Sequence, residues 1–173
     1  MGGLRAVMID IHETALEAGM ATLAGSLERL VSKGKIDAAA RDNALARIET
    51  STDYQRLADV DIVIEAATEN GELKNRILRQ IEAAVRPDAI IASNTSSISI
   101  TTLGATLADP SRFIGMHFFN PVPLLALVEI IRGLQTSAET EAAVRELTLR
   151  LDKSPVGVRN SPGFVVNRIL VPM

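Results

Sequence analysis

The chain has 173 residues, of which 47% are hydrophobic, so it can form one domain with a sizeable core, or one domain with a small attachment. Its net charge of −3 argues against nucleic-acid binding, because that function needs clustered Lys and Arg to neutralise phosphates. It has no cysteine and only two histidines, which excludes disulfides and a cysteine nucleophile and leaves little for a metal site.

The first half of the chain alternates short apolar runs with longer amphipathic segments, a pattern typical of βαβ units and a mainly parallel sheet. Residues 4–10 form a short apolar run that ends in an acid. Helical spacing over residues 13–31 and 37–48, with the turn "KGKID" between them, predicts a helical hairpin. Residues 60–67 read as a strand buried on both faces, and residues 72–85 predict a helix that stops before a proline.

The second half continues this alternation. Residues 88–94 and 112–121 predict two more buried strands, and an apolar run at residues 125–131 follows them. Helical spacing returns over residues 138–151, and the proline of "SPGFVVNRIL" predicts the first turn of a new helix. No apolar run approaches the roughly 20 residues of a membrane span, and the start lacks the pattern of a signal peptide. We therefore expect a soluble, cytoplasmic protein.

The two ends of the chain differ from those of a complete dinucleotide-binding fold. In that fold an acid ending the second strand lies about 20 residues beyond the G-x-G-x-x-G loop. Asp10 resembles this acid, yet only nine residues precede it, and "MGG" has no strand before it. The last residue, Met173, falls about three turns into the predicted new helix. We therefore expect a chain that lacks the first βα unit and is truncated at both ends.

His117 and Glu129 are candidates for acid–base chemistry. His117 ends an apolar strand, and parallel sheets bind ligands at the carboxyl ends of their strands. Glu129 interrupts the apolar run "LALVEII", where a carboxylate needs a partner. If the two side chains meet, the carboxylate orients the imidazole and raises its basicity. The alternative, which the spacing alone favours, is a core histidine and a glutamate that faces water.

Other polar residues have a structural interpretation beside a functional one. The stretch "SNTSS", which contains Ser96, follows a buried strand, so it can position a polar substrate or cap the next helix. Asp10 can cap the helix that follows it. Asn167, Ser26 and Lys33 read as ordinary solvent-exposed positions on helices. No G-x-S-x-G motif surrounds the serines, which disfavours hydrolase chemistry through a serine nucleophile.

Together these stretches resemble the 3-hydroxyacyl-CoA dehydrogenase family, including bacterial 3-hydroxybutyryl-CoA dehydrogenases. The resemblance runs almost the full length of the chain, and its most specific motifs are "SNTSS" and "HFFNPV". It also includes "VMIDI", "SLERLVSKGKI", "VIEAATEN" and "SPGFVVNRILVPM". The resemblance implies an α/β, Rossmann-like, doubly wound and mainly parallel sheet with a helical-hairpin insertion. Residues 1–160 would then form an incomplete NAD-binding domain, and residues 161–173 the start of a C-terminal helical domain for substrate binding and dimerisation.

The resemblance assigns the chemistry to four residues. His117 matches the catalytic base of the family, and Glu129 matches the acid that pairs with it. Ser96 matches a serine that contacts the substrate and lies near the nicotinamide. Asn167 matches an asparagine that helps to hold the oxygen of the substrate. The implied reaction is the NAD-dependent oxidation of an (S)-3-hydroxyacyl-CoA, such as 3-hydroxybutyryl-CoA, to the 3-oxoacyl-CoA, in fatty-acid or butanoate metabolism.

Cofactor and coenzyme A contacts follow from the same resemblance. Asp10 matches the acid that binds the adenosine ribose, which favours NAD over NADP because a carboxylate repels a 2′-phosphate. Glu69 and Lys74 fall where the family contacts the cofactor. Ser26 and Lys33 fall where the helical hairpin contacts coenzyme A, and the charge of the lysine suits a phosphate. No metal is implied, and the full-length parent is expected to be a homodimer.

Two alternatives remain beside this interpretation. A decayed or repurposed relative could keep the scaffold as a binding or assembly module, which the truncation favours and the intact site residues oppose. A 6-phosphogluconate-type dehydrogenase is disfavoured, because those enzymes use a lysine base and "HFFNP" is foreign to them. The chain by itself is expected to have little or no dehydrogenase activity, because no glycine-rich loop supplies backbone amides for the pyrophosphate.

Overall fold

The computed structural model describes residues 3–161 and 163–167, so most of the predicted C-terminal helix lies outside the described residues. The chain divides into two compact units, the first ending at Leu57 and the second beginning at Ala58. This division does not coincide with the predicted domain boundary near residue 160, which stays a prediction. None of the described helices has the length and apolar composition that crossing a bilayer requires.

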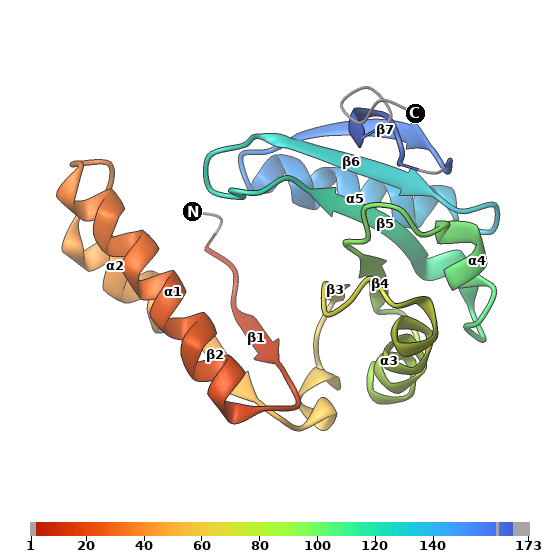
Figure 1. Ribbon diagram of the computed structural model, residues 1–173, viewed down its shortest axis with the longest axis horizontal. Helices are drawn as coiled ribbons and strands as arrows, with labels where there is room; N and C mark the ends of the chain where they lie inside the picture. The colour runs from red at the N-terminus through yellow and green to blue at the C-terminus, as the bar shows by residue number, and fades with distance from the viewer. Residues whose placement is uncertain (1–2, 162, 168–173) are drawn as a thin grey trace. The chain divides into compact units, whose positions relative to one another are not determined.

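The first unit is a small parallel sheet with a helical hairpin (Figure 1). Its elements are β1 (Ala6–Ile9), α1 (Glu13–Ser32), α2 (Ala38–Leu45), β2 (Ile48–Ser51) and a 3₁₀ turn at Tyr54–Leu57. Gly34, with φ of 63°, occupies the left-handed conformation that ends α1. Asp37 then caps α2, since its carboxylate accepts a hydrogen bond from the amide of Ala40 at 2.7 Å.

The predicted hairpin is therefore confirmed, but the predicted helix at residues 37–48 is too long. Helix α2 ends at Leu45, and Ile48 opens the strand β2, which pairs in parallel with β1. The sequence "IETS" of this strand has too few apolar residues to be distinguished from the end of an amphipathic helix. Pairing with β1, which lies about 40 residues earlier in the chain, decides the conformation.

The second unit contains a five-stranded sheet with the strand order β3-β4-β5-β6-β7. All neighbouring strands are parallel except β5 and β6, which are antiparallel. The strands are β3 (Ile62–Glu65), β4 (Ile90–Ser93), β5 (Phe113–Phe118), β6 (Leu127–Arg132) and β7 (Ser154–Arg159). The helices are α3 (Gly71–Ala84), α4 (Ile100–Gly104), a 3₁₀ turn at Pro110–Arg112, and α5 (Ala138–Arg150).

The two faces of β5 and β6 pack against different helices. On one face Val144 of α5 packs into an apolar cluster with Ile114, Met116, Val128 and Ile130, and Figure 1 shows α5 lying along β5, β6 and β7. Helix α4 packs against the opposite face.

Close packing on the α4 face depends on Gly115. A Cβ atom at this position would lie 2.8 Å from the side chain of Ile100. Side chains alternate between the faces of a strand, so odd-numbered residues of β5 and β6 share the face that α4 covers. His117 and Glu129 both belong to this set.

The predicted fold class is confirmed: the chain is an α/β protein with a Rossmann-like, mostly parallel sheet. The sheet is in two pieces, since β1 pairs only with β2, and β3 only with β4, among the described residues.

Candidate functional site

The sheet register places His117 directly opposite Glu129. The two residues are partners in the antiparallel β5–β6 pair, so their side chains leave the sheet side by side on the α4 face. The Nδ1 atom of His117 lies 2.9 Å from Oε2 of Glu129, and only 8% and 1% of these side chains are exposed. The contact that the sequence left open is therefore present.

The carboxylate also selects a tautomer of the imidazole. An ionised carboxylate can only accept hydrogen bonds, so Nδ1 of His117 must carry the proton that points at Glu129. The neutral ring then has its lone pair on Nε2, which is the arrangement a general base needs.

Two aromatic rings border the imidazole. The ring centroid of Phe119 lies 4.6 Å from that of His117, and the centroid of Phe164 lies 5.8 Å away, both at tilted angles. Phe164 is fully buried and comes from the segment that follows β7. These contacts explain why the chain places its few aromatic residues near this histidine: they keep one side of the ring in apolar surroundings.

The loop after β4 approaches the same region through several hydrogen bonds. The side chain of Asn94 accepts from the amide of Phe118 at 2.8 Å, which ties the end of β4 to the end of β5 beside His117. Asn167 donates from Nδ2 to the carbonyl oxygen of Ser96 at 3.3 Å. The structure thus brings the predicted site residues Ser96 and Asn167 into contact with each other, and His117 into contact with Glu129.

Glu69 also binds this loop. Its carboxylate accepts hydrogen bonds from the amide of Ser96 at 2.7 Å, the hydroxyl of Ser96 at 3.1 Å and the hydroxyl of Thr95 at 2.7 Å. The helix-capping interpretation of "SNTSS" is wrong, because the N-cap of α4 is Ser99, which lies beyond this stretch.

The hydrogen bonds to Glu69 lower the pKa of its carboxyl group. Burial by itself raises the pKa of Glu69, but the bonds from Ser96 and Thr95, with the charge of Lys74, hold the pKa below its ordinary value of 4.5. A carboxyl group whose pKa is lowered by folding stabilises the fold above its ordinary pKa. This contribution disappears as the pH falls through the lower folded-state pKa.

We therefore expect Glu69→Gln to destabilise the protein at neutral pH and to make little difference in acid, where the wild-type carboxyl group is itself protonated. Urea unfolding of both proteins across this pH range measures the difference in free energy. A difference that is equally large in acid would mean that the charge of Glu69 is not what stabilises the loop.

Lys74, predicted to contact the cofactor, forms a buried ion pair within the protein, and its predicted role stays a prediction. Its side chain is 1% exposed, and its ammonium group donates to Oε2 of Glu65 and, at 3.4 Å, to the hydroxyl of Ser93. The hydroxyl of Ser93 in turn donates to Glu65 at 2.9 Å. The described hydrogen bonds of the ammonium group thus go to buried side chains at the ends of β3 and β4.

Sequence reasoning missed two participants in this region. Glu65 interrupts an apolar strand in the same way as Glu129 does, so the same signal could have identified it as a buried carboxylate with a partner. Asn94 had no such signal, because its bond to the amide of Phe118 depends on the pairing of β4 with β5.

The remaining predicted residues belong to the first unit. Asp10 follows β1, and one carboxylate oxygen accepts from the amide of His12, which is the N-cap of α1 in place of Asp10. The other oxygen of Asp10 has no hydrogen bond among the described residues. Ser26 accepts a hydrogen bond from Arg29 on α1, and Lys33 is exposed at the end of that helix.

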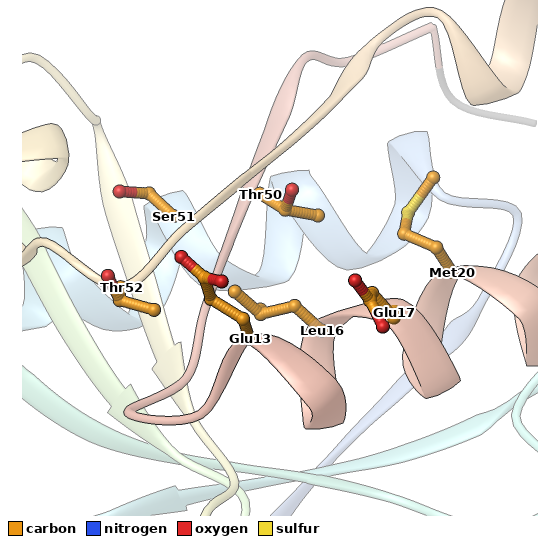
Figure 2. Close-up of a pocket in the computed structure, with 7 residues that line it drawn as sticks. All are labelled: Glu13, Leu16, Glu17, Met20, Thr50, Ser51 and Thr52. Atoms are coloured by element: carbon orange, nitrogen blue, oxygen red, sulfur yellow. The ribbon is translucent and has the colours of Figure 1, made fainter.

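A pocket of about 310 Å³ also lies in the first unit, between α1 and β2. Figure 2 shows the side chains that surround it: Glu13, Leu16, Glu17, Met20, Thr50, Ser51 and Thr52. None of the predicted ligand-binding residues is among them. Two carboxylates beside the opening make it unsuited to a phosphate group.

Comparison with known proteins gives a consistent result. Residues 1–161 match the family described as 3-hydroxyacyl-CoA dehydrogenase, NAD binding domain. The chain is 47% identical over 171 residues to a probable 3-hydroxybutyryl-CoA dehydrogenase of Deinococcus radiodurans, covering 99% of the chain and 61% of the relative. It is 46% identical over 170 residues to the fatty acid oxidation complex subunit alpha of Acinetobacter baylyi, covering 98% of the chain and 24% of that protein.

Solved structures show the same similarity. A crystal structure of the (S)-3-hydroxybutyryl-CoA dehydrogenase of Ralstonia eutropha matches with a TM-score of 0.96 and 60% identity, over 98% of this chain and 60% of that one. The FadB2 protein of M. tuberculosis matches with a TM-score of 0.96 and 40% identity, over 99% of this chain and 61% of that one. The chain therefore spans about three fifths of the length of the Deinococcus, Ralstonia and M. tuberculosis relatives.

Proposed function

Because the chain belongs to the 3-hydroxyacyl-CoA dehydrogenase family and carries the NAD-binding domain of that family, we propose that the protein containing it oxidises an (S)-3-hydroxyacyl-CoA to the 3-oxoacyl-CoA. The proposed substrate is a short one, 3-hydroxybutyryl-CoA, in fatty-acid or butanoate metabolism, since relatives of this name match almost the whole chain. The observation that carries the proposal is the buried hydrogen bond between His117 and Glu129.

In this proposal His117 removes a proton from the substrate. Its Nε2 atom takes the proton of the C3 hydroxyl group, and the imidazolium that forms is stabilised by the carboxylate of Glu129 at Nδ1. When bound, NAD supplies the acceptor for the hydride that leaves C3. Acid–base assistance of this kind contributes about 10²–10⁴-fold to the rate, and alignment of the reactants supplies much of the remainder.

The residues at the predicted cofactor positions fit NAD. Asp10 directly follows the parallel strand β1, and its second carboxylate oxygen, which has no hydrogen bond among the described residues, could accept from ribose hydroxyls. Glu69 and Ser96 stand together at the ends of β3 and β4, where a parallel sheet presents its ligand site. Lys74 is proposed to support the cofactor site through its ion pair with Glu65. Its positive charge also helps to keep Glu69 ionised, because it lowers the pKa of that carboxyl group.

The remaining predicted site residues are proposed to bind the substrate. Ser96 and Asn167 would hold the oxygen at C3, and the hydrogen bond between them supports a shared task. Ser26 and Lys33, on the hairpin, would contact coenzyme A, and the exposed position of Lys33 is compatible with a phosphate partner. A homodimer and a cytoplasmic location are part of the same proposal.

NADH-dependent reduction of acetoacetyl-CoA tests this function. The protein that contains the chain should catalyse it, whereas the 173-residue chain alone should show little or no turnover, because its sequence has no G-x-G-x-x-G loop to hold the pyrophosphate. Near-normal turnover by the chain alone would refute the second expectation. No turnover by the containing protein would refute the function and favour a non-catalytic relative.

A further inference from the structure

Glu129 uses both of its carboxylate oxygens within the protein. Oε2 contacts Nδ1 of His117 at 2.9 Å, and Oε1 accepts hydrogen bonds from the amides of Val165 at 3.1 Å and Val166 at 3.0 Å. With 1% of its surface exposed, this carboxylate has almost no access to water, so these three groups supply its solvation. The two backbone bonds link β6 to the segment that leads to Asn167.

A strained turn aims these amides at the carboxylate. Gly163 and Phe164 have φ values of 71° and 49°, and the amide of Phe164 donates to the carbonyl oxygen of Ser161 at 2.9 Å. The left-handed conformation is ordinary for glycine but unfavourable for phenylalanine. A strained residue persists only where its surroundings fix it. Here the surroundings are the buried ring of Phe164 beside His117 and the charge of Glu129.

We infer that Glu129, beyond its contact with His117, anchors the helical turn that carries Asn167. Asn167 follows directly after Val166 and reaches the carbonyl oxygen of Ser96, so the position of its side chain depends on this anchor. The roles of His117 and Asn167 in catalysis rest on the proposed function, whereas the anchoring itself does not.

The backbone amides also determine what an amide side chain would do at this position. In Glu129→Gln, only the carbonyl oxygen can accept from Val165 and Val166, so the NH₂ group must face Nδ1 of His117. The ring must then accept at Nδ1 and carry its proton on Nε2, where it cannot act as a base. The Gln variant therefore keeps the anchor and loses the base, whereas Glu129→Ala loses both.

Hydrogen exchange of the Val165 and Val166 amides tests the anchor without reference to activity. In the protein that contains the chain, Glu129→Ala should speed exchange at both amides by about tenfold or more, since each loses a bond to a charged group. Glu129→Gln should stay within about threefold of wild type. His117→Gln is the matched control, because it keeps Glu129, and it should also leave the exchange unchanged. Unchanged exchange in Glu129→Ala overturns the inference.

A second measurement tests the inference if Glu129→Ala does not fold. Nitrogen NMR of the imidazole in Glu129→Gln should show the proton on Nε2, in contrast to wild type, and a proton on Nδ1 would overturn the inference. Failure of the proposed function can be distinguished from failure of this inference. A fully active His117→Gln protein would remove the base from the mechanism, yet faster exchange in Glu129→Ala would still establish the anchor.

Discussion

Replacing His117 by Gln should lower kcat for reduction of acetoacetyl-CoA by about a hundredfold or more, in the protein that contains this chain. The reason is that Gln cannot exchange a proton with the substrate oxygen, although it fills a similar volume in the apolar surroundings of Phe119 and Phe164. Steady-state assays that monitor NADH absorbance measure the effect. The dissociation constant for NAD should change little, because the substitution leaves in place Asp10 and Glu69, the proposed cofactor contacts, and the hydrogen bonds of Glu69 to Thr95 and Ser96.

The other histidine offers a matched control. His12 is exposed at the start of α1, and its side chain makes no capping bond, so His12→Gln should leave kcat within about twofold of wild type. If His117→Gln lowered kcat only several-fold, His117 would not be the base. If both substitutions lowered kcat equally, the effect would not be specific to the site.

Replacing Lys74 by Met should destabilise the protein by about 3–5 kcal/mol, because the buried carboxylate of Glu65 would lose the charge that compensates it. Urea unfolding of the wild type and the variant measures the loss. The hydroxyl of Ser93 would remain as a partner of Glu65, but a hydroxyl cannot replace an ammonium group. This effect would be large for a single substitution, since point variants typically lose about 1 kcal/mol.

The double variant Lys74→Met/Glu65→Leu distinguishes the contribution of the ion pair to stability from that of side-chain packing. Removing both charges should recover most of the stability, because a buried pair can often be replaced by apolar residues without loss. Failure of the second substitution to recover stability would mean that the shape of Lys74, and not its pairing with Glu65, is what matters. A stable Lys74→Met protein that binds NADH weakly would instead indicate direct contact with the cofactor.

The strands that form the site could be predicted because they are buried. Residues 60–67, 88–94 and 112–121 are apolar runs whose centres became β3, β4 and β5. The same logic identified Glu129, since a charge inside such a run needs a partner. Strand β2 escaped prediction because its four residues continue the polar pattern of a helix, and only pairing with β1 makes them a strand.

The contacts of the site with backbone groups could not be predicted. The second oxygen of Glu129 binds amides 36 and 37 residues away, which have no signature in a sequence of side chains. Lys74 was expected at the cofactor only because of the family resemblance, and its own pattern gave no sign that it is buried. Its burial depends on the ion pair with Glu65, and no pattern in the sequence names Lys74 as the partner of that carboxylate.

A crystal structure of the protein with 3-hydroxybutyryl-CoA bound would test the proposed role of the imidazole most directly. The distance to measure joins Nε2 of His117 to the oxygen on C3 of the ligand, and we expect about 2.6–3.2 Å, with Glu129 still bound to Nδ1. An oxygen beyond hydrogen-bond reach of Nε2, with no water between them, would contradict the proposal that this ring accepts the proton of the substrate.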